Sequence, residues 1–172
     1  LKPAMAFTLI ALVAFYLFHL VLLALGTTGE GGRFHWFATG LVAAWAVAAI
    51  VFQRWTSRNP RRILPAYCWA ASNVLLVTLF LLQADGPRSP LVIAYPLLIA
   101  GTALRYRTGL LWFVTSLSAV NYVGLVAEAA LLRPQFSVRF KDWVIFTIGL
   151  FVLGFVQRLL LRRIKATSPG ER

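Results

Sequence analysis

Apolar residues form six long stretches along the chain, and short polar segments separate them. A helix needs about 20 predominantly apolar residues to cross the hydrocarbon core of a bilayer. Strands of a membrane barrel would alternate apolar and polar positions, and these stretches do not, so helices are expected. The pattern predicts an all-α, polytopic membrane protein with six transmembrane helices. These are expected at residues 5–25, 37–52, 66–83, 91–104, 110–131 and 143–160.

The composition of the chain excludes a water-soluble fold. Hydrophobic residues make up 60% of the 172 residues and charged residues only 13%, and the mean hydropathy is +0.78. Soluble domains carry about 25% charged residues. The single cysteine, Cys68, excludes both an intramolecular disulfide and a metal motif built on two cysteines. We predict one six-helix transmembrane domain at residues 1–166 and a cytoplasmic tail at residues 167–172.

Positive charge is distributed unevenly between the predicted loops. If the six spans alternate in direction, twelve of the 17 Lys and Arg residues fall on the side of both termini and five on the other side. Cytoplasmic loops are enriched in Lys and Arg, so both termini are predicted to be cytoplasmic. The net charge of +12 is therefore expected to meet anionic lipid headgroups and not nucleic acid. The arginines expected at headgroups follow the second span: Arg54, Arg58, Arg61 and Arg62.

A few polar and aromatic residues inside the spans are candidates for binding a small ligand. Asn73 and Asn121 both lie several residues from a membrane interface, where an unpaired amide costs free energy. Tyr95 precedes Pro96 in the shortest span, where a kink or an unwound turn is expected. Trp45 lies in the middle of its span, away from the interfaces where Trp is common. Hydrogen bonds and packing between helices account for the same four residues, and both interpretations stay open.

Residues typical of catalysis or cofactor binding are scarce. Nucleophile-elbow, phosphate-loop and zinc-protease motifs are missing, and so are paired carboxylates, so the chain by itself is not expected to be an enzyme. Glu128, the one acid in a predicted span, lies close to Arg133 and is not expected to form a proton pathway. His19 and His35 are the two histidines, and haem held by this pair is not expected. We predict no metal and no cofactor.

Two segments carry a resemblance to a known kind of protein. GPRSPLVIAYPLLIAGTALRYRTGLLWFVTSLSAVNYVGL (86–125) and VIFTIGLFVLGFVQRLLLRRIKA (144–166) resemble the six-helix membrane modules of bacterial signalling kinases. The resemblance is greatest to modules that follow the catalytic domain of membrane-bound serine/threonine kinases. Next are those that precede histidine kinase or nucleotide cyclase domains. The shared features are the Gly, Ser and Pro turn, the following Arg pair and the basic end of the last helix.

The resemblance implies a module that anchors a signalling kinase in the bacterial cytoplasmic membrane, oligomerises and senses a signal. It transfers no functional residue and names no ligand. The first residue, Leu1, and the short tail through Pro169 suit a membrane module that follows a soluble domain. The alternative function is an accessory membrane subunit of a larger redox or photosynthetic complex. The expected partners are membrane lipids and either further copies of the chain or other membrane subunits.

Overall fold

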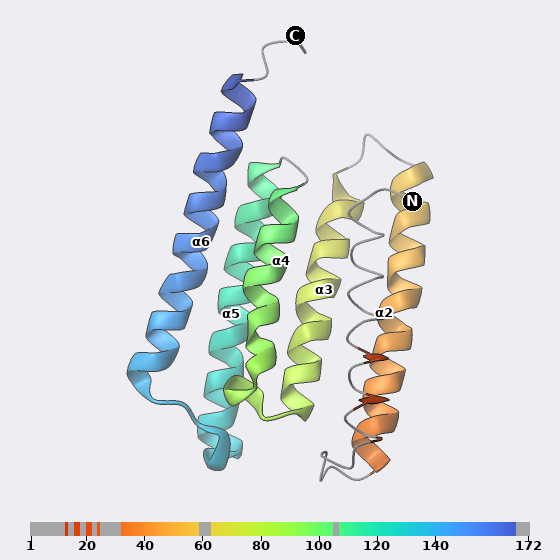
Figure 1. Cartoon of the computed structure of the whole chain (residues 1–172), viewed down its shortest axis with the longest axis vertical. Coiled ribbons are helices and arrows are strands. Elements are labelled where there is room, and N and C mark those ends of the chain that lie inside the picture. The colour runs from red at the N-terminus through yellow and green to blue at the C-terminus, as the bar shows by residue number, and fades with distance from the viewer. Residues whose placement is uncertain are drawn as a thin grey trace. The chain divides into compact units, whose positions relative to one another are not determined.

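The computed structural model describes residues 32–58, 63–104 and 107–167, together with positions 13, 16, 17, 20, 21 and 24. These residues form helices and connecting turns, with no strand among them, so the predicted all-α fold is confirmed for this part of the chain (Figure 1). The α-helices are α2 (Gly32–Arg58), α3 (Leu64–Gln83), α4 (Ala94–Ala103), α5 (Thr108–Leu132) and α6 (Phe140–Thr167). The 3₁₀ helices are η1 (Gly86–Arg88), η2 (Pro90–Ile93) and η3 (Pro134–Phe136).

Four described helices contain a segment that is long and apolar enough to cross a membrane. A shorter apolar helical segment, Pro90–Ala103, coincides with the predicted fourth span. The predicted first span, residues 5–25, lies outside the described residues except for six positions, which are helical. The count of six spans and the cytoplasmic placement of both termini therefore remain predictions. The four segments are His35–Thr56, Leu64–Gln83, Thr108–Leu132 and Phe140–Ile164.

The predicted end of the second span is wrong by about one and a half turns. The sequence interpretation ended this helix at Phe52, before the first arginine, but α2 continues to Arg58. Charged residues are compatible with a helix wherever its end reaches water, because the long Arg side chain extends along the helix toward the polar region. Arg54 and Arg58 are accordingly exposed on the last turns of α2 and do not lie in a loop.

Contacts divide the chain into two compact units, Leu1–Trp69 and Ala70–Arg172. In the first unit, the hydroxyl groups of Tyr16 and Thr39 lie 3.2 Å apart, which ties an N-terminal helical position to α2. Near the other end of α2, the ring centroid of Phe52 lies 5.9 Å from that of Trp55 and 5.9 Å from that of Trp69. Aromatic contacts therefore join α2 to the first turns of α3.

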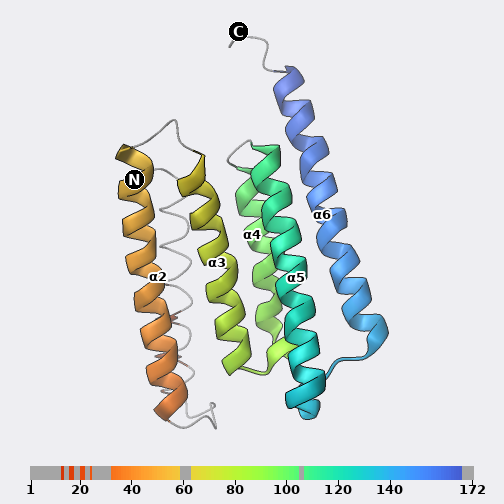
Figure 2. The ribbon, with the colours of Figure 1, turned by 180° about the vertical axis from the view of Figure 1, so that it is seen from behind.

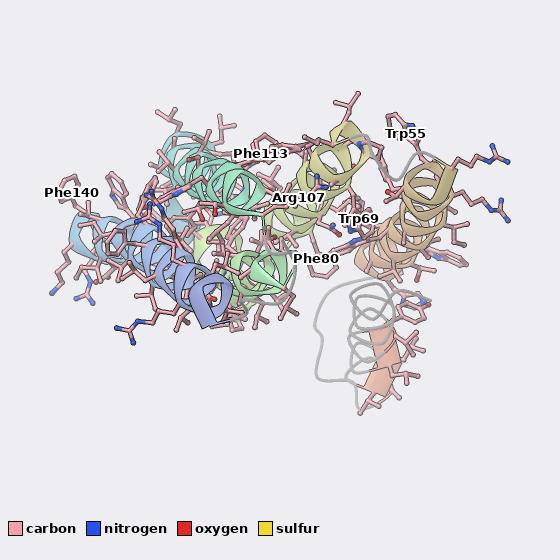
Figure 3. All side chains as sticks on the ribbon, turned by 90° about the horizontal axis from the view of Figure 1, so that it is seen from above. Trp55, Trp69, Phe80, Arg107, Phe113 and Phe140 are labelled. Atoms are coloured by element: carbon pink, nitrogen blue, oxygen red, sulfur yellow. The ribbon has the colours of Figure 1, made fainter. Side chains whose placement is uncertain are left out.

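In the second unit, the remainder of α3 is followed by α4, α5 and α6, and each helix reverses the direction of the one before it (Figures 1 and 2). Short connections bring consecutive helices side by side in this way. Viewed along the helices, α4, α5 and α6 cluster so that each lies beside the other two (Figure 3). The fully buried side chains at the centre include Leu81, Tyr95, Ile99, Leu111, Leu125 and Leu150.

The 3₁₀ helices η1 and η3 lie together at one end of the second unit, which we call the capped end. Gly86 in η1 has φ +57°, a left-handed conformation that favours glycine. The Arg88 guanidinium donates to the main-chain oxygens of Ser137 and Gln135, at 2.9 Å each. The opposite end, with the turn between α4 and α5 and the last residues of α6, is called the basic end.

Pro96 was expected to kink or unwind its helix, but it does not. It lies in the first turn of α4, where backbone N–H groups have no carbonyl partner within the helix, so the missing N–H of proline costs little. The irregular part comes earlier, as the 3₁₀ helix η2, whose first turn is capped by the Ser89 hydroxyl accepting from the Leu91 N–H. The predicted unwound turn is therefore placed before Tyr95.

Candidate functional site

Three polar side chains from three helices meet inside the second unit, and we call this group the polar junction: Thr78 of α3, Tyr95 of α4 and Asn121 of α5. The Thr78 hydroxyl oxygen lies 2.8 Å from the Tyr95 hydroxyl oxygen and 3.2 Å from Asn121 Oδ1. Tyr95 is completely buried, whereas Thr78 and Asn121 are half-buried. The polar junction thus links segments that are 17 and 43 residues apart in the sequence.

Thr78 is the centre of the polar junction because its hydroxyl group contacts both of the other side chains. More than one acceptor lies within reach of its single proton. Its hydroxyl oxygen also lies 2.8 Å from the main-chain oxygen of Val74, one turn earlier in α3. A hydroxyl carries one proton, so at any moment Thr78 donates to only one of three oxygens: Val74 O, Asn121 Oδ1 or Tyr95 Oη. When Thr78 donates to Val74 or Asn121, the Tyr95 hydroxyl donates to Thr78. The same heavy-atom positions therefore allow more than one hydrogen-bond arrangement.

Asn121 is oriented by its own helix. Its Nδ2 donates to the main-chain oxygen of Leu117 at 2.8 Å, which leaves Oδ1 directed at Thr78. A reversed amide would place Oδ1 against the Leu117 oxygen, and two acceptors do not bond. The junction contains no carboxylate, histidine or lysine. Its chemistry is therefore hydrogen bonding between helices, and not acid–base catalysis.

Aromatic contacts extend the polar junction to α6. The ring of Tyr95 lies edge-on to Tyr122 of α5, with centroids 6.4 Å apart. Tyr122 in turn packs against Phe146 of α6 at 4.4 Å. Both distances lie within or close to the range of favourable aromatic pairs. A change in the position of Tyr95 would therefore reach α6 through two packed rings.

A second point of contact between α5 and α6 depends on a glycine. A Cβ atom at Gly154 would lie 2.7 Å from Thr115 Oγ1 and 3.0 Å from its Cγ2, so α6 presents bare backbone to α5 here. Thr115 is fully buried and donates to the Leu111 main-chain oxygen at 2.9 Å. Small residues permit such close approach between membrane helices. Ser118, one turn further along α5, is buried, and its hydroxyl has no partner among the described residues.

The capped end contains an ion pair with two hydrogen bonds, between Arg133 and Glu128. Arg133 donates from Nε and Nη2 to the two carboxylate oxygens of Glu128, at 2.8 and 2.7 Å, and from Nη1 to the Ala84 main-chain oxygen at 3.4 Å. The side chains of Arg133 and Glu128 are only 23% and 25% exposed. The sequence analysis placed Glu128 close to Arg133, and the structure shows that the two side chains pair.

The structure brings together two of the four predicted ligand-binding residues. Tyr95 and Asn121 meet at the polar junction, whereas Asn73 is buried on α3, five residues before Thr78, and is not part of it. Trp45 lies half-buried on α2 in the other unit. Of the four predicted headgroup arginines, two are exposed on α2 and two lie outside the described residues; the latter are Arg61 and Arg62.

Thr78 was not among the predicted site residues, although it lies inside an apolar span. Three other threonines inside apolar helices each donate to a carbonyl oxygen one turn earlier in their own helix; they are Thr102, Thr115 and Thr147. Threonine in a helix commonly bonds this way, so the residue type alone does not distinguish these residues from Thr78. The described residues contain no group of three or more His, Cys, Asp or Glu able to hold a metal.

Comparison of the chain with protein-family models, with curated proteins and with solved structures finds no match. The assignment of function therefore depends on the residues and geometry described above.

Proposed function

We propose that this chain is a multi-pass membrane module that anchors a bacterial signalling kinase in the cytoplasmic membrane and passes a signal through the packing of α3 to α6. The observation that carries the proposal is the polar junction of Thr78, Tyr95 and Asn121, in which a single Thr78 proton has more than one acceptor. A ligand, lipid or partner that displaces one of these three side chains would change the hydrogen bonds that join α3, α4 and α5, and would thereby favour a different packing of the helices. The helices long enough to cross a membrane support the anchoring role.

The position of α6 supports the direction in which the signal travels. Gly154 lies against Thr115, and α5 begins at Thr108, seven residues before Thr115. The antiparallel partner of Thr108 is therefore Leu161, and α6 continues to Thr167. Six residues of helix, about 9 Å at 1.5 Å per residue, thus extend past the start of α5 (Figures 1 and 2). A movement of α6 against α5 would therefore also move this extension, at the basic end of the bundle.

The orientation that we propose places the basic end, and both termini, in the cytoplasm. Reporter fusions to the loops after α2, α3 and α4 test it. We expect the α2–α3 and α4–α5 loops to report cytoplasm, and the α3–α4 loop to report the outer side. Neutralising four arginines together should weaken this bias without abolishing insertion, and an unchanged topology map would contradict their role. The four residues are Arg54, Arg58, Arg61 and Arg62.

The proposed kinase association is tested by the intact mass and N-terminal sequence of the native polypeptide, extracted in detergent from its source membrane. A mass well above 19.1 kDa, with a kinase sequence on the same polypeptide, is the expected result. Kinase activity should then change when Thr78 is replaced by Val, which removes the hydroxyl. A mass near 19.1 kDa with no kinase domain would overturn the proposal.

A second candidate function is an accessory subunit of a larger membrane complex, and the exposed surface of α6 is compatible with it. Large apolar side chains are exposed along much of this helix, including Ile145, Ile148, Val152 and Phe155. Such a surface is compatible with lipid, with another subunit or with a second copy of the chain. Stoichiometric copurification with a redox or photosynthetic complex would favour this candidate, and purification as a homo-oligomer attached to a kinase would exclude it.

A further inference from the structure

At the basic end of α6, one guanidinium nitrogen is buried without a hydrogen-bond partner among the described residues. Arg158 is half-buried on α6, and its Nε is buried with no hydrogen-bond partner among the described residues. It lies one turn after Gly154 on the helix face that is turned toward α5, and Leu161 on the same face is buried. A buried N–H that bonds to nothing costs free energy, so this geometry is favourable only when an acceptor is present.

The helix register shows which groups surround Arg158. Because Gly154 lies against Thr115 in an antiparallel pair, Arg158 is level with Leu111, and Arg162 is level with Arg107. Arg107 and Arg162 are both exposed. Arg107 also occupies the N-cap of α5 and makes no side-chain cap hydrogen bond, so the first N–H groups of α5 are left without a side-chain acceptor. Arg107, Arg158 and Arg162 therefore lie at similar levels at the basic end, with Arg158 and Arg162 one turn apart on α6.

No carboxylate of the described part of the chain neutralises this group. Asp85, Glu128 and Asp142 all belong to the capped end, where Arg133 pairs with Glu128 and Arg139 with Asp142. The other two acidic residues, Glu30 and Glu171, lie outside the described residues. Among the described residues no acceptor is present for the Arg158 Nε–H, and an anion from another molecule would bond to it more strongly than a neutral acceptor would.

The surroundings of these arginines indicate the class of molecule. Leu159, Leu160 and Ile164 are exposed on α6 between and beside the basic residues. A free phosphate ion or a nucleic acid would gain nothing from such apolar side chains, whereas a phospholipid offers both a phosphate and acyl chains. We propose that Arg158, with Arg162 one turn further along α6, binds the phosphate of an anionic membrane lipid. The proposal rests on the membrane placement in the proposed function, but not on the kinase association.

Native mass spectrometry of the purified full chain, exchanged into mixed phosphatidylglycerol and phosphatidylcholine, tests this site. Wild type should retain phosphatidylglycerol preferentially, and Arg158→Gln should weaken that retention about tenfold, as expected for a lost hydrogen bond between charged groups. The matched control is Arg139→Gln at the capped end, which removes the same charge from an exposed position. It should retain phosphatidylglycerol like wild type.

Other results of this experiment would contradict particular parts of the proposal. Equal losses in Arg158→Gln and Arg139→Gln would mean that general charge attraction, and not this site, holds the lipid. Displacement of the lipid by millimolar glycerol phosphate would show that a free phosphate is the ligand and would overturn the lipid assignment. If Arg158→Gln does not fold, Arg158→Lys keeps the charge but lacks the Nε–H group, and it should still weaken retention. Unchanged retention in Arg158→Lys would overturn the role of Nε. None of these results depends on whether a kinase domain is attached.

Discussion

Replacing Gly154 by Ala tests the close contact between α5 and α6. The new Cβ would lie 2.7 Å from Thr115 Oγ1, 3.0 Å from Cγ2 and 3.4 Å from Cβ. Rotating the Thr115 side chain would break its hydrogen bond to Leu111, and its full burial leaves no open space to turn into. The two helices would therefore have to separate by about 0.7 Å, the difference between 2.7 Å and the 3.4 Å at which ordinary contact begins.

The magnitude follows from the cost of overpacking. Inserting a methyl group into a well-packed site costs about 1–3 kcal/mol. Ala also has a higher helix propensity than Gly, and Gly149→Ala measures this gain alone, since nothing lies within 4 Å of a Cβ at that position of the same helix. We therefore expect Gly154→Ala to be less stable than Gly149→Ala by about 1–3 kcal/mol.

Equilibrium unfolding by SDS in mixed micelles, followed by circular dichroism, measures these free energies. Thr115→Ala removes the two nearest atoms and leaves only Cβ, at 3.4 Å. In a double-mutant cycle, Gly154→Ala should therefore cost much less in the Thr115→Ala background than in wild type. Equal stability of Gly154→Ala and Gly149→Ala, or simple additivity in the cycle, would refute the steric reasoning.

Two further predictions use matched pairs, with unfolding free energy measured in the same way. Thr78→Val should destabilise the chain by about 1–2 kcal/mol, and Thr102→Val by much less. Both hydroxyl groups bond to a carbonyl oxygen of their own helix, but only Thr78 also contacts side chains of two other helices. Equal losses of stability would show that the polar junction does not stabilise the fold. Glu128→Gln should cost about 1–2 kcal/mol by weakening the partly buried pair with Arg133. Asp142→Asn, in an exposed pair, should cost under about 0.5 kcal/mol, and the reverse order would contradict the burial argument.

The sequence alone predicted the helical class and most of the helix positions. Apolar stretches long enough to span a bilayer can only be helices, because their backbone groups must pair within the segment. This reasoning was less reliable at helix ends: it ended the second span before Arg54, although a charged side chain can remain on a helix that reaches the interface. It also expected a break at Pro96, which instead lies in the first turn of α4.

The site was partly predictable. Tyr95 and Asn121 were identified because polar groups inside apolar spans need partners, but Thr78 was not distinguished from Thr102. Residue type and depth are local properties and can be read from hydropathy. Which side of a helix meets which neighbour depends on its rotation and register, and these are set by packing over the whole bundle.

The arginines illustrate the same division. Their separation into two groups along the chain follows from the sequence, because consecutive spans reverse direction. Only the tertiary structure decided that Arg133 reaches both oxygens of Glu128, whereas Arg158 has a buried Nε without an acceptor. The Gly154 contact with Thr115 sets the register of α6 on α5, and that register determines which arginines come together. The hydropathy pattern along the chain cannot specify this register, because it does not determine how two helices are rotated relative to each other.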